Sequence, residues 1–210
     1  MRIVILANSK RQGGRCVAGI SLDTGDWIRP VPRSDSRAIP SKLVANLTLL
    51  DIVDVPLSGD VPSPPDSYQR ENHFVDDWDW KTIGKLSTKK AMAFCETGAP
   101  ILYSATDRVK CETLDALAPR DWKSLTLIHT EVSFEKDPYK PRDWRAVVHD
   151  GQGNLLRLKV TDMAIGPRLC ELNGDATDCL LTVSLGGPWA PDDQSLPPMC
   201  YKLVAGVIEL

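Results

Sequence analysis

The sequence has no long hydrophobic run and few aromatic residues. Aromatic side chains make up 6% of its 210 residues, against 25% charged and 42% hydrophobic residues. The longest apolar stretches, such as residues 3–7 and 203–208, are far shorter than the ~20 residues that span a bilayer as a helix. No basic and apolar leader of the kind that directs secretion opens the chain. We therefore expect a globular protein of the cytoplasm with no membrane partner.

Paired cysteines are also missing. The six cysteines are dispersed and none belongs to a Cys-x-x-Cys pair, which excludes zinc-knuckle and thioredoxin-like motifs. Without an export signal, free buried thiols are expected rather than disulfides. The three histidines are equally isolated, so the sequence predicts no metal and no cofactor. These residues are Cys16, Cys95, Cys111, Cys170, Cys179, Cys200, His73, His129 and His149.

Motifs of nucleophilic catalysis and nucleotide hydrolysis are absent as well. The sequence has no Gly-x-Ser-x-Gly elbow and no Gly-Lys-Ser/Thr ending of a Walker loop. Cys16 follows Arg15, which favours a thiolate, but no histidine lies near it in the sequence. We predict no catalytic residue, and a binding function is favoured over an enzymatic one.

What the sequence does have is a cationic amino end. The formal net charge of the whole chain is −3, yet residues 1–42 contain eight cations and three anions, a balance of +5. The rest of the chain therefore carries −8. Segregated charge creates a local positive surface that attracts a polyanion at short range. The alternative is a solvated surface whose arginines pair with the acidic remainder.

Short runs of branched apolar residues predict a mostly β protein. Residues 2–8 form the first run, and hairpins are indicated around turn signals at residues 23–26 and 150–154. Eight or nine strands are expected in total. The pattern favours two small OB-like β-barrels in tandem over alternating β-α-β units.

Two short helices are expected near the middle of the chain. Ser87 is placed to cap a helix over residues 88–96, and a second helix is predicted over residues 113–118. We place the domain boundary in this region, with an N-terminal barrel over residues 1–97 and a C-terminal barrel over residues 98–210. In an alternative arrangement, the last strand of the chain belongs to the N-terminal barrel.

The first predicted loop has the composition of an anion-binding site. Gly13 and Gly14 can expose successive backbone N–H groups to a phosphate. Lys10, Arg11 and Arg15 would neutralise its charge. The alternative is a flexible hairpin connection with solubilising cations.

Tryptophan beside arginine on a predicted strand is typical of a nucleic-acid groove. Trp27 and Arg29 are two residues apart and project from one face of a strand, and Arg142 lies near Trp144. An indole on a strand offers a stacking platform worth ~1–3 kcal/mol per base. If the face points inward, the indole is core and the arginine needs a buried partner. The predicted nucleic-acid contacts are Lys10, Arg11, Gly13, Gly14, Arg15, Trp27, Arg29, Arg33, Arg37, Arg142 and Trp144.

Two other functions stay open as alternatives, and an acidic segment supports the first of them. Residues 71–79 hold His73 among four carboxylates. Such a cluster could bind Mg²⁺ for phosphodiester cleavage, which would make the protein a metal-dependent nuclease or phosphodiesterase. The spacing matches no nuclease signature, and acidic loops usually face water. The second alternative is a protein-interaction scaffold.

Two stretches resemble a bacterial protein family. The segments "IVILANSKRQGGRCVAGISLDTGDWIRPV" and "SLGGPWAPDDQSLPPMCYKLVAGVIEL" are similar to the dual OB-containing domain proteins. Because they lie at opposite ends, the resemblance covers the whole chain. It implies two oligonucleotide-binding barrels and recognition of nucleic acid or nucleotide. The matching positions are Asn8, Ser9, Gly14, Arg15, Cys16, Gly19, Trp27, Ile28, Arg29, Ser184, Leu185, Tyr201 and Lys202.

Together these observations predict a non-enzymatic module that binds single-stranded nucleic acid or a nucleotide. A net charge of −3 is unusual for a protein that coats long strands, so a short or specific ligand is expected. If ~3–5 phosphates are contacted, the log–log slope of affinity against salt on single strands is about −2 to −4.

Overall fold

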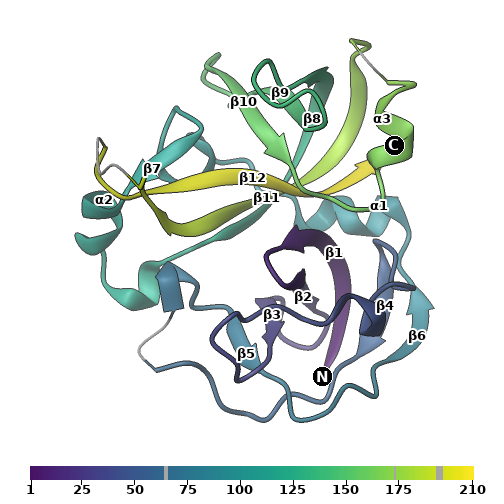
Figure 1. The fold of residues 1–210 in the computed structure, drawn as a ribbon. Coiled ribbons are helices and arrows are strands. Elements are labelled where there is room, and N and C mark those ends of the chain that lie inside the picture. Colours follow the sequence, from purple (N-terminus) through teal and green to yellow (C-terminus); the bar gives the residue numbers. More distant parts are fainter. Residues whose placement is uncertain (64–65, 173, 193–195) are drawn as a thin grey trace.

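Two six-stranded β-sheets, one from each half of the chain, make up the protein (Figure 1). The computed structural model describes residues 1–63, 66–172, 174–192 and 196–210. The N-terminal sheet lies below the C-terminal one in Figure 1, and the last strands of the chain cross over the first. The mostly β architecture predicted from the sequence is confirmed. None of the helices in the described residues is long and apolar enough to cross a membrane.

The N-terminal half forms an open sheet with the order β5-β3-β2-β1-β4-β6. Only β3 and β5 pair in parallel, and within the described residues β5 and β6 do not pair to close the sheet. β3 leaves β2 after Ile28, as expected of a strand that contains Pro30. The strands are β1 (Arg2–Arg11), β2 (Gly14–Ser21), β3 (Trp27–Val31), β4 (Asp51–Asp54), β5 (Asn72–Phe74) and β6 (Lys81–Lys85).

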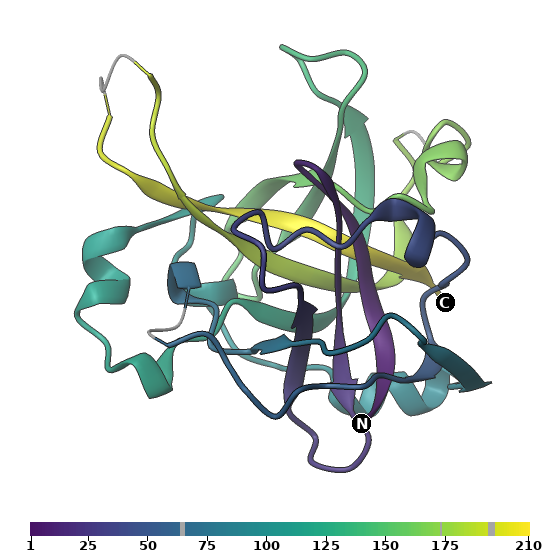
Figure 2. The ribbon, with the colours of Figure 1, turned by 60° about the horizontal axis from the view of Figure 1, so that its bottom comes forward.

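The C-terminal half forms a closed barrel. Its sheet has the order β10-β9-β8-β11-β12-β7, and parallel pairing of β10 with β12 closes five of these strands. Figure 2 shows β11 and β12 side by side along their length. The strands are β7 (Arg108–Lys110), β8 (Leu125–Lys136), β9 (Trp144–His149), β10 (Leu155–Val160), β11 (Thr177–Trp189) and β12 (Met199–Glu209).

Short helices connect the strands. The predicted helix after Ser87 is confirmed: the Ser87 side chain accepts a hydrogen bond from the Lys90 amide, although the helical segment ends at Phe94. The second predicted helix begins at Cys111, two residues early, and a third near Ile165 was not predicted. The α-helices are α1 (Thr88–Ala91), α2 (Cys111–Asp115) and α3 (Gly166–Leu169), and the 3₁₀-helices are η1 (Ser41–Leu43), η2 (Asp66–Tyr68), η3 (Met92–Phe94), η4 (Ile101–Tyr103) and η5 (Pro119–Asp121).

Both predicted hairpins form, and side-chain hydrogen bonds fix their turns. Between β2 and β3, the Ser21 hydroxyl accepts from the amides of Asp23 and Thr24. Between β9 and β10, the Asp150 carboxylate accepts from the Asn154 amide and side chain. These are the local bonds that make serine and aspartate good turn residues.

The six cysteines are all free, as expected. Burial, also expected, applies fully only to Cys179 and Cys200. Burial raises the pKa of each of these two thiols to about 12. Both are therefore protonated and unreactive at neutral pH.

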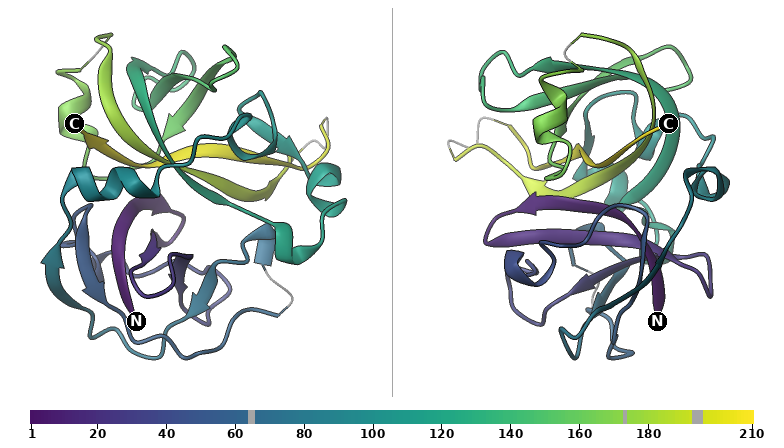
Figure 3. Two further views of the ribbon diagram at one scale, coloured as in Figure 1. Left: turned by 180° about the vertical axis from the view of Figure 1, so that it is seen from behind. Right: turned by 90° about the vertical axis from the view of Figure 1, so that its right-hand side faces the viewer.

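The two halves share part of their core. One cluster packs Val4 and Leu6 of β1 against Leu180 of β11 and Ile208 of β12. Helix α1 lies beside this junction (Figure 3), and its Ala91 is part of the same cluster. The shared core explains why β1 is buried on both faces.

β1 and β12 approach each other closely at Gly206. A Cβ at this position would lie 2.1 Å from the Leu6 carbonyl oxygen, so only glycine fits. The same oxygen accepts a hydrogen bond from the Thr182 hydroxyl of β11. β12 pairs with β7, β10 and β11, and in the described residues it packs on the N-terminal sheet without joining it. The domain boundary expected after residue 97 falls in the segment between β6 and β7 and stays a prediction.

Candidate functional site

The β1–β2 hairpin carries the predicted basic loop. Gly13 has a φ of +84°, which glycine adopts without strain. A Cβ on Gly14 would lie 2.2 Å from the Ile39 carbonyl oxygen, and that oxygen accepts a hydrogen bond from the Arg15 amide at 2.8 Å. Turn geometry and close packing therefore account for both glycines without a bound phosphate.

Several of the expected cations are engaged locally. The Arg15 guanidinium donates to the Asn8 side-chain oxygen at 3.3 Å. Arg33 pairs with Asp60 at 2.8 Å and lies 4.5 Å from the centre of the Phe74 ring. Arg37 lies 4.9 Å from the same ring. These arginines surround Phe74 and Asn8, so they do not form a continuous track beside Trp27.

Trp144 is a core residue. Its side chain is 8% exposed, and the Lys136 ammonium lies 3.8 Å from its ring centre. Arg142 is exposed in the turn before β9, in the C-terminal half. The expected stacking platform at Trp144 is therefore corrected: hydrophobic burial, not base stacking, explains this tryptophan.

The position of the Arg29 side chain differs most from the sequence prediction. We expected it to face solvent beside Trp27, but its side chain is 1% exposed. It forms an ion pair with Glu71 at 2.9 Å and donates to Asn72 at 3.3 Å and Ser124 at 2.9 Å. The shared solvent-facing surface of Trp27 and Arg29 does not exist because Arg29 lies at the junction of the two halves, where a carboxylate compensates its charge.

Arg29 nevertheless lines a cavity of about 230 Å³ between the two halves. Lys10 and Arg11 at the end of β1 line it too. None of the described residues around this cavity is acidic, and neither Lys10 nor Arg11 forms an ion pair within the described chain. The remaining lining residues are Ser9, Cys16, Ser67, Gln69, Thr161, Ser184, Leu185, Gly186, Gly187, Leu203 and Ala205.

Residues of both halves hold the cavity together. The Lys10 amide donates to the Thr161 carbonyl at 2.8 Å, which ties β1 to the end of β10. Next to it, the Asp162 carboxylate accepts from the amides of Ala164 and Val207. Burial raises the pKa of Asp162. The cavity therefore exists only where the two sheets meet.

One buried donor in the wall of the cavity lacks a partner. Among the described residues, no acceptor lies within hydrogen-bond distance of the Arg29 Nε. Its terminal nitrogens are satisfied by Glu71, Asn72 and Ser124, with Ser184 at 3.4 Å. Buried donors are rarely left unpaired because the loss costs ~1–3 kcal/mol.

Trp27 lies on a second, larger groove of about 840 Å³. The groove also holds Trp122 and three cations, but these cations have acidic neighbours. Lys123 pairs with Glu96, and Arg120 lies 3.9 Å from Asp121. The lining includes Trp27, Trp122, Arg70, Arg120, Lys123, Asp26, Glu71, Glu96 and Asp121. The groove therefore lacks the excess of positive charge that the cavity has.

The acidic segment does not form a metal site. Glu71 is buried against Arg29, and Asp79 pairs with Lys81 at 3.3 Å. The Asp77 carboxylate accepts from the amides of Trp78 and Asp79. No group of three or more potential metal ligands occurs anywhere in the residues that the structure describes. The cluster expected for a nuclease is thus dispersed.

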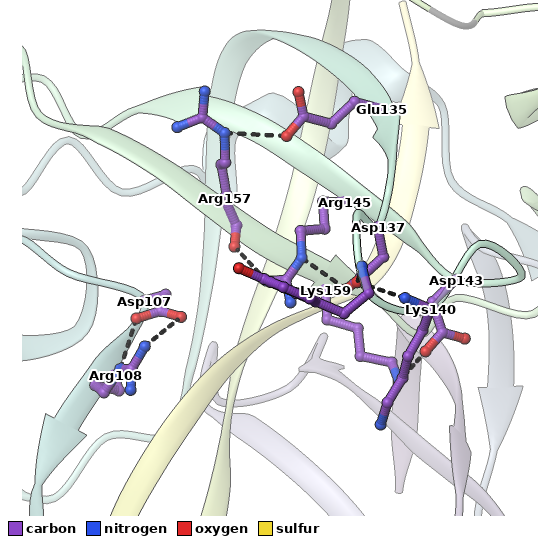
Figure 4. A network of polar contacts seen from close by, with 10 residues as sticks. Asp107, Arg108, Glu135, Asp137, Lys140, Asp143, Arg145, Arg157 and Lys159 are labelled. Carbon is purple, nitrogen blue, oxygen red and sulfur yellow. Dashed lines mark hydrogen bonds and ion pairs between the residues drawn. The ribbon is translucent and has the colours of Figure 1, made fainter.

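The C-terminal barrel has its own concentration of cations, some of which line a hollow of about 430 Å³. Figure 4 shows the acidic side chains beside them. Here each cation faces a carboxylate. The pairs are Arg108–Asp107 at 2.8 Å, Arg145–Asp137 at 2.8 Å, Arg157–Glu135 at 3.0 Å and Lys159–Asp143 at 2.6 Å. The Tyr139 and Lys140 amides and Arg145 lower the pKa of Asp137.

Sequence reasoning missed the part of the cavity wall that β11 provides. Ser184, Gly186 and Gly187 belong to β11, about 150 residues from Arg29 in the chain. Their signal was present in the resemblance, because it included Ser184 and Leu185 together with Ser9, Cys16 and Arg29. Positions that match a family at both ends of a chain can thus converge in space.

The family assignment follows from the whole chain. The dual OB-containing domain matches residues 1–207, which include both sheets and every wall of the cavity. The chain belongs to the dual OB-containing domain family. No curated protein matches this dual OB-containing domain protein at a significant level.

One solved structure is similar over the full length of the chain. It is described as "Molecular basis for abrogation of activation of pro-inflammatory cytokines" and is 13% identical. The match covers 100% of the present chain and 91% of the other, with a TM-score of 0.29. A likeness this low supports no conclusion about fold or function.

Proposed function

We propose that this dual OB-containing domain protein is a non-enzymatic module that binds single-stranded nucleic acid or a nucleotide. The observation that carries the proposal is the cavity between the halves, which three cations and no described acidic residue line. OB folds commonly present such sites to oligonucleotides. Two of these cations, Lys10 and Arg11, offer a phosphate positive charge that no carboxylate of the described residues neutralises.

The residues of the cavity have different roles in this proposal. Lys10 and Arg11, at the end of β1, supply positive charge, and the Arg11 Nε donates to the Ser36 carbonyl oxygen at 3.0 Å. Arg29 is fixed by its buried bonds to Glu71, Asn72 and Ser124 and forms a rigid part of the wall. The hydroxyls of Ser9 and Ser184 add further hydrogen-bonding capacity.

The larger groove is the second candidate surface for a nucleic acid. Trp27 and Trp122 are half-buried there and could stack a base, in line with the sequence prediction for Trp27. Burial and the neighbouring Arg70 lower the pKa of Lys123, and its ammonium is already paired with Glu96. The groove therefore suits bases better than phosphates.

Lys10→Gln is the sharpest test of the phosphate contact. Fluorescence anisotropy with labelled single-stranded DNA and RNA should show affinity about tenfold weaker, the usual effect of one charge-assisted contact. Lys42→Gln is the matched control, since Lys42 is an exposed lysine of η1 in the same cationic segment. It should leave affinity unchanged. If both variants lowered the affinity equally, the binding would depend on the overall charge of the segment, and the cavity would not be the binding site.

Salt dependence tests the number of contacts. Arg29 is already compensated by Glu71, so only Lys10 and Arg11 contribute net charge. The log–log slope on single strands should then be about −1.4, shallower than the −2 to −4 expected from the sequence. A slope near zero would argue against nucleic-acid binding as a whole.

A further inference from the structure

We infer that the group received by the cavity is a terminal phosphate monoester, as in a nucleoside monophosphate or at the phosphorylated end of a strand. This inference rests on the proposed function and narrows it. An internal phosphodiester is the competing ligand chemistry. Size, charge and hydrogen-bonding capacity each favour the monoester.

The size of the cavity favours the end of a ligand over the middle of a strand. Its volume of about 230 Å³ is below the ~300–1,000 Å³ of pockets that enclose a whole ligand. A phosphate and part of its sugar can enter a space of this kind. A chain that continues on both sides of the phosphate needs two exits.

Charge favours a dianion. The positive charge of Arg29 is balanced by Glu71 at 2.9 Å, whereas Lys10 and Arg11 have no ion-pair partner in the described chain. The cavity thus offers two net positive charges. A phosphate monoester carries about −1.5 to −2 at pH 7, while a phosphodiester carries a single negative charge. The charge of a monoester is therefore closer to the two positive charges of the cavity than the charge of a phosphodiester is.

The donors of the cavity also match three terminal oxygens. Lys10 and Arg11 supply charged donors, and the hydroxyls of Ser9 and Ser184 supply uncharged ones. A monoester presents three strong acceptor oxygens. A phosphodiester presents only two terminal oxygens.

The part of the wall that β11 provides leaves room for a ligand. The register of β11 with β12 shifts between Leu185 and Pro188, a bulge that contains Gly186 and Gly187. Bulges of this kind are over-represented beside binding sites. Both glycines line the cavity, where they leave space that side chains would fill.

The test compares strands that differ only at one end. The probes are thymidine decamers with a 5′-phosphate, a 3′-phosphate or neither, together with AMP, adenosine and inorganic phosphate. A decamer with a terminal phosphate should bind about tenfold more tightly than the unphosphorylated one. Lys10→Gln should abolish the difference, and Lys42→Gln should preserve it.

The arms of the experiment also identify the source of the group. Binding of AMP but not adenosine identifies a free nucleotide as sufficient, and preference for one phosphorylated end identifies a strand terminus; both support the inference. Equal affinity for all three decamers, lowered equally by Lys10→Gln, overturns the inference and leaves the proposed function intact. No binding of any probe contradicts both.

Cys16 provides a second measurement that does not depend on a variant. Its free, partly exposed thiol lines the cavity, whereas the exposed Cys170 lies outside it. Alkylation followed by peptide mass spectrometry should show that AMP or inorganic phosphate slows the labelling of Cys16 and leaves Cys170 unchanged. Equal labelling of Cys16 with and without saturating AMP contradicts occupation of the cavity.

Discussion

The cavity between the sheets and the network on the C-terminal barrel use the same kinds of cation with opposite results. In the network, Arg108, Arg145, Arg157 and Lys159 each face a carboxylate (Figure 4). At the cavity, Lys10 and Arg11 face none in the described chain. The network is a structural set of ion pairs, and the cavity has charge left over. The presence of cations in a sequence is therefore a weak guide to a binding site. Whether a carboxylate of the folded protein faces each cation determines how much charge is left for a ligand.

The largest expected effect concerns the buried cation of the cavity. Arg29→Met should lower the free energy of unfolding by about 3–5 kcal/mol, because it leaves Glu71 buried and unpaired. Arg157→Met in the network should cost less than ~1 kcal/mol, because its side chain is 54% exposed. Urea denaturation measures both.

A double variant sharpens this result. Arg29→Met with Glu71→Leu removes both buried charges and should recover most of the loss. If the double variant is as unstable as the single one, the ion pair is not the source of the effect.

The next effect concerns a buried cation on the C-terminal side. Lys202 is 2% exposed and donates to the Ser104 carbonyl oxygen, and burial lowers its pKa from 10.5 to about 8. Between these pH values the unfolded chain binds more protons, so this group makes stability rise from pH 8 to 10.5. The rise should approach ~3 kcal/mol relative to Lys202→Met. Parallel pH profiles of the two proteins would contradict the assignment.

A smaller effect tests the close contact between β1 and β12, two strands that both contribute residues to the cavity. Gly206→Ala places a methyl group against the Leu6 carbonyl oxygen and should cost about 1–3 kcal/mol while weakening binding of phosphorylated probes. Gly98→Ala is the control, because nothing lies within 4 Å of its Cβ position. Thermal unfolding and anisotropy give the two readouts. If Gly206→Ala changed neither the stability nor the affinity, the close contact between β1 and β12 would not be needed for either.

Local patterns predicted much of the fold. The Ser87 cap, the hairpin at Asp150 and the apolar run of β1 are all read from neighbouring residues, and all appear as expected. Helix α3 was missed because its four residues carry too little periodicity to register. The closure of one barrel depends on β10 pairing with β12, a contact between distant segments that no local pattern encodes.

The site was only partly predictable for the same reason. Composition identified Lys10 and Arg11, which do line the cavity. Composition could not show that Arg29 is buried in an ion pair with Glu71, because the two residues lie 42 positions apart in the chain. Alternation along β3 placed Trp27 and Arg29 on one face but gave no information about what that face meets.

The hydrogen bond from the Lys10 amide to Thr161 has a consequence for regulation. A ligand seated beside it would bridge strands from opposite ends of the chain and act as a reversible cross-link. At a hundredfold excess over its dissociation constant, such a cross-link adds about 2.7 kcal/mol to the folded state. The lifetime of the protein in a cell would then follow the supply of its ligand.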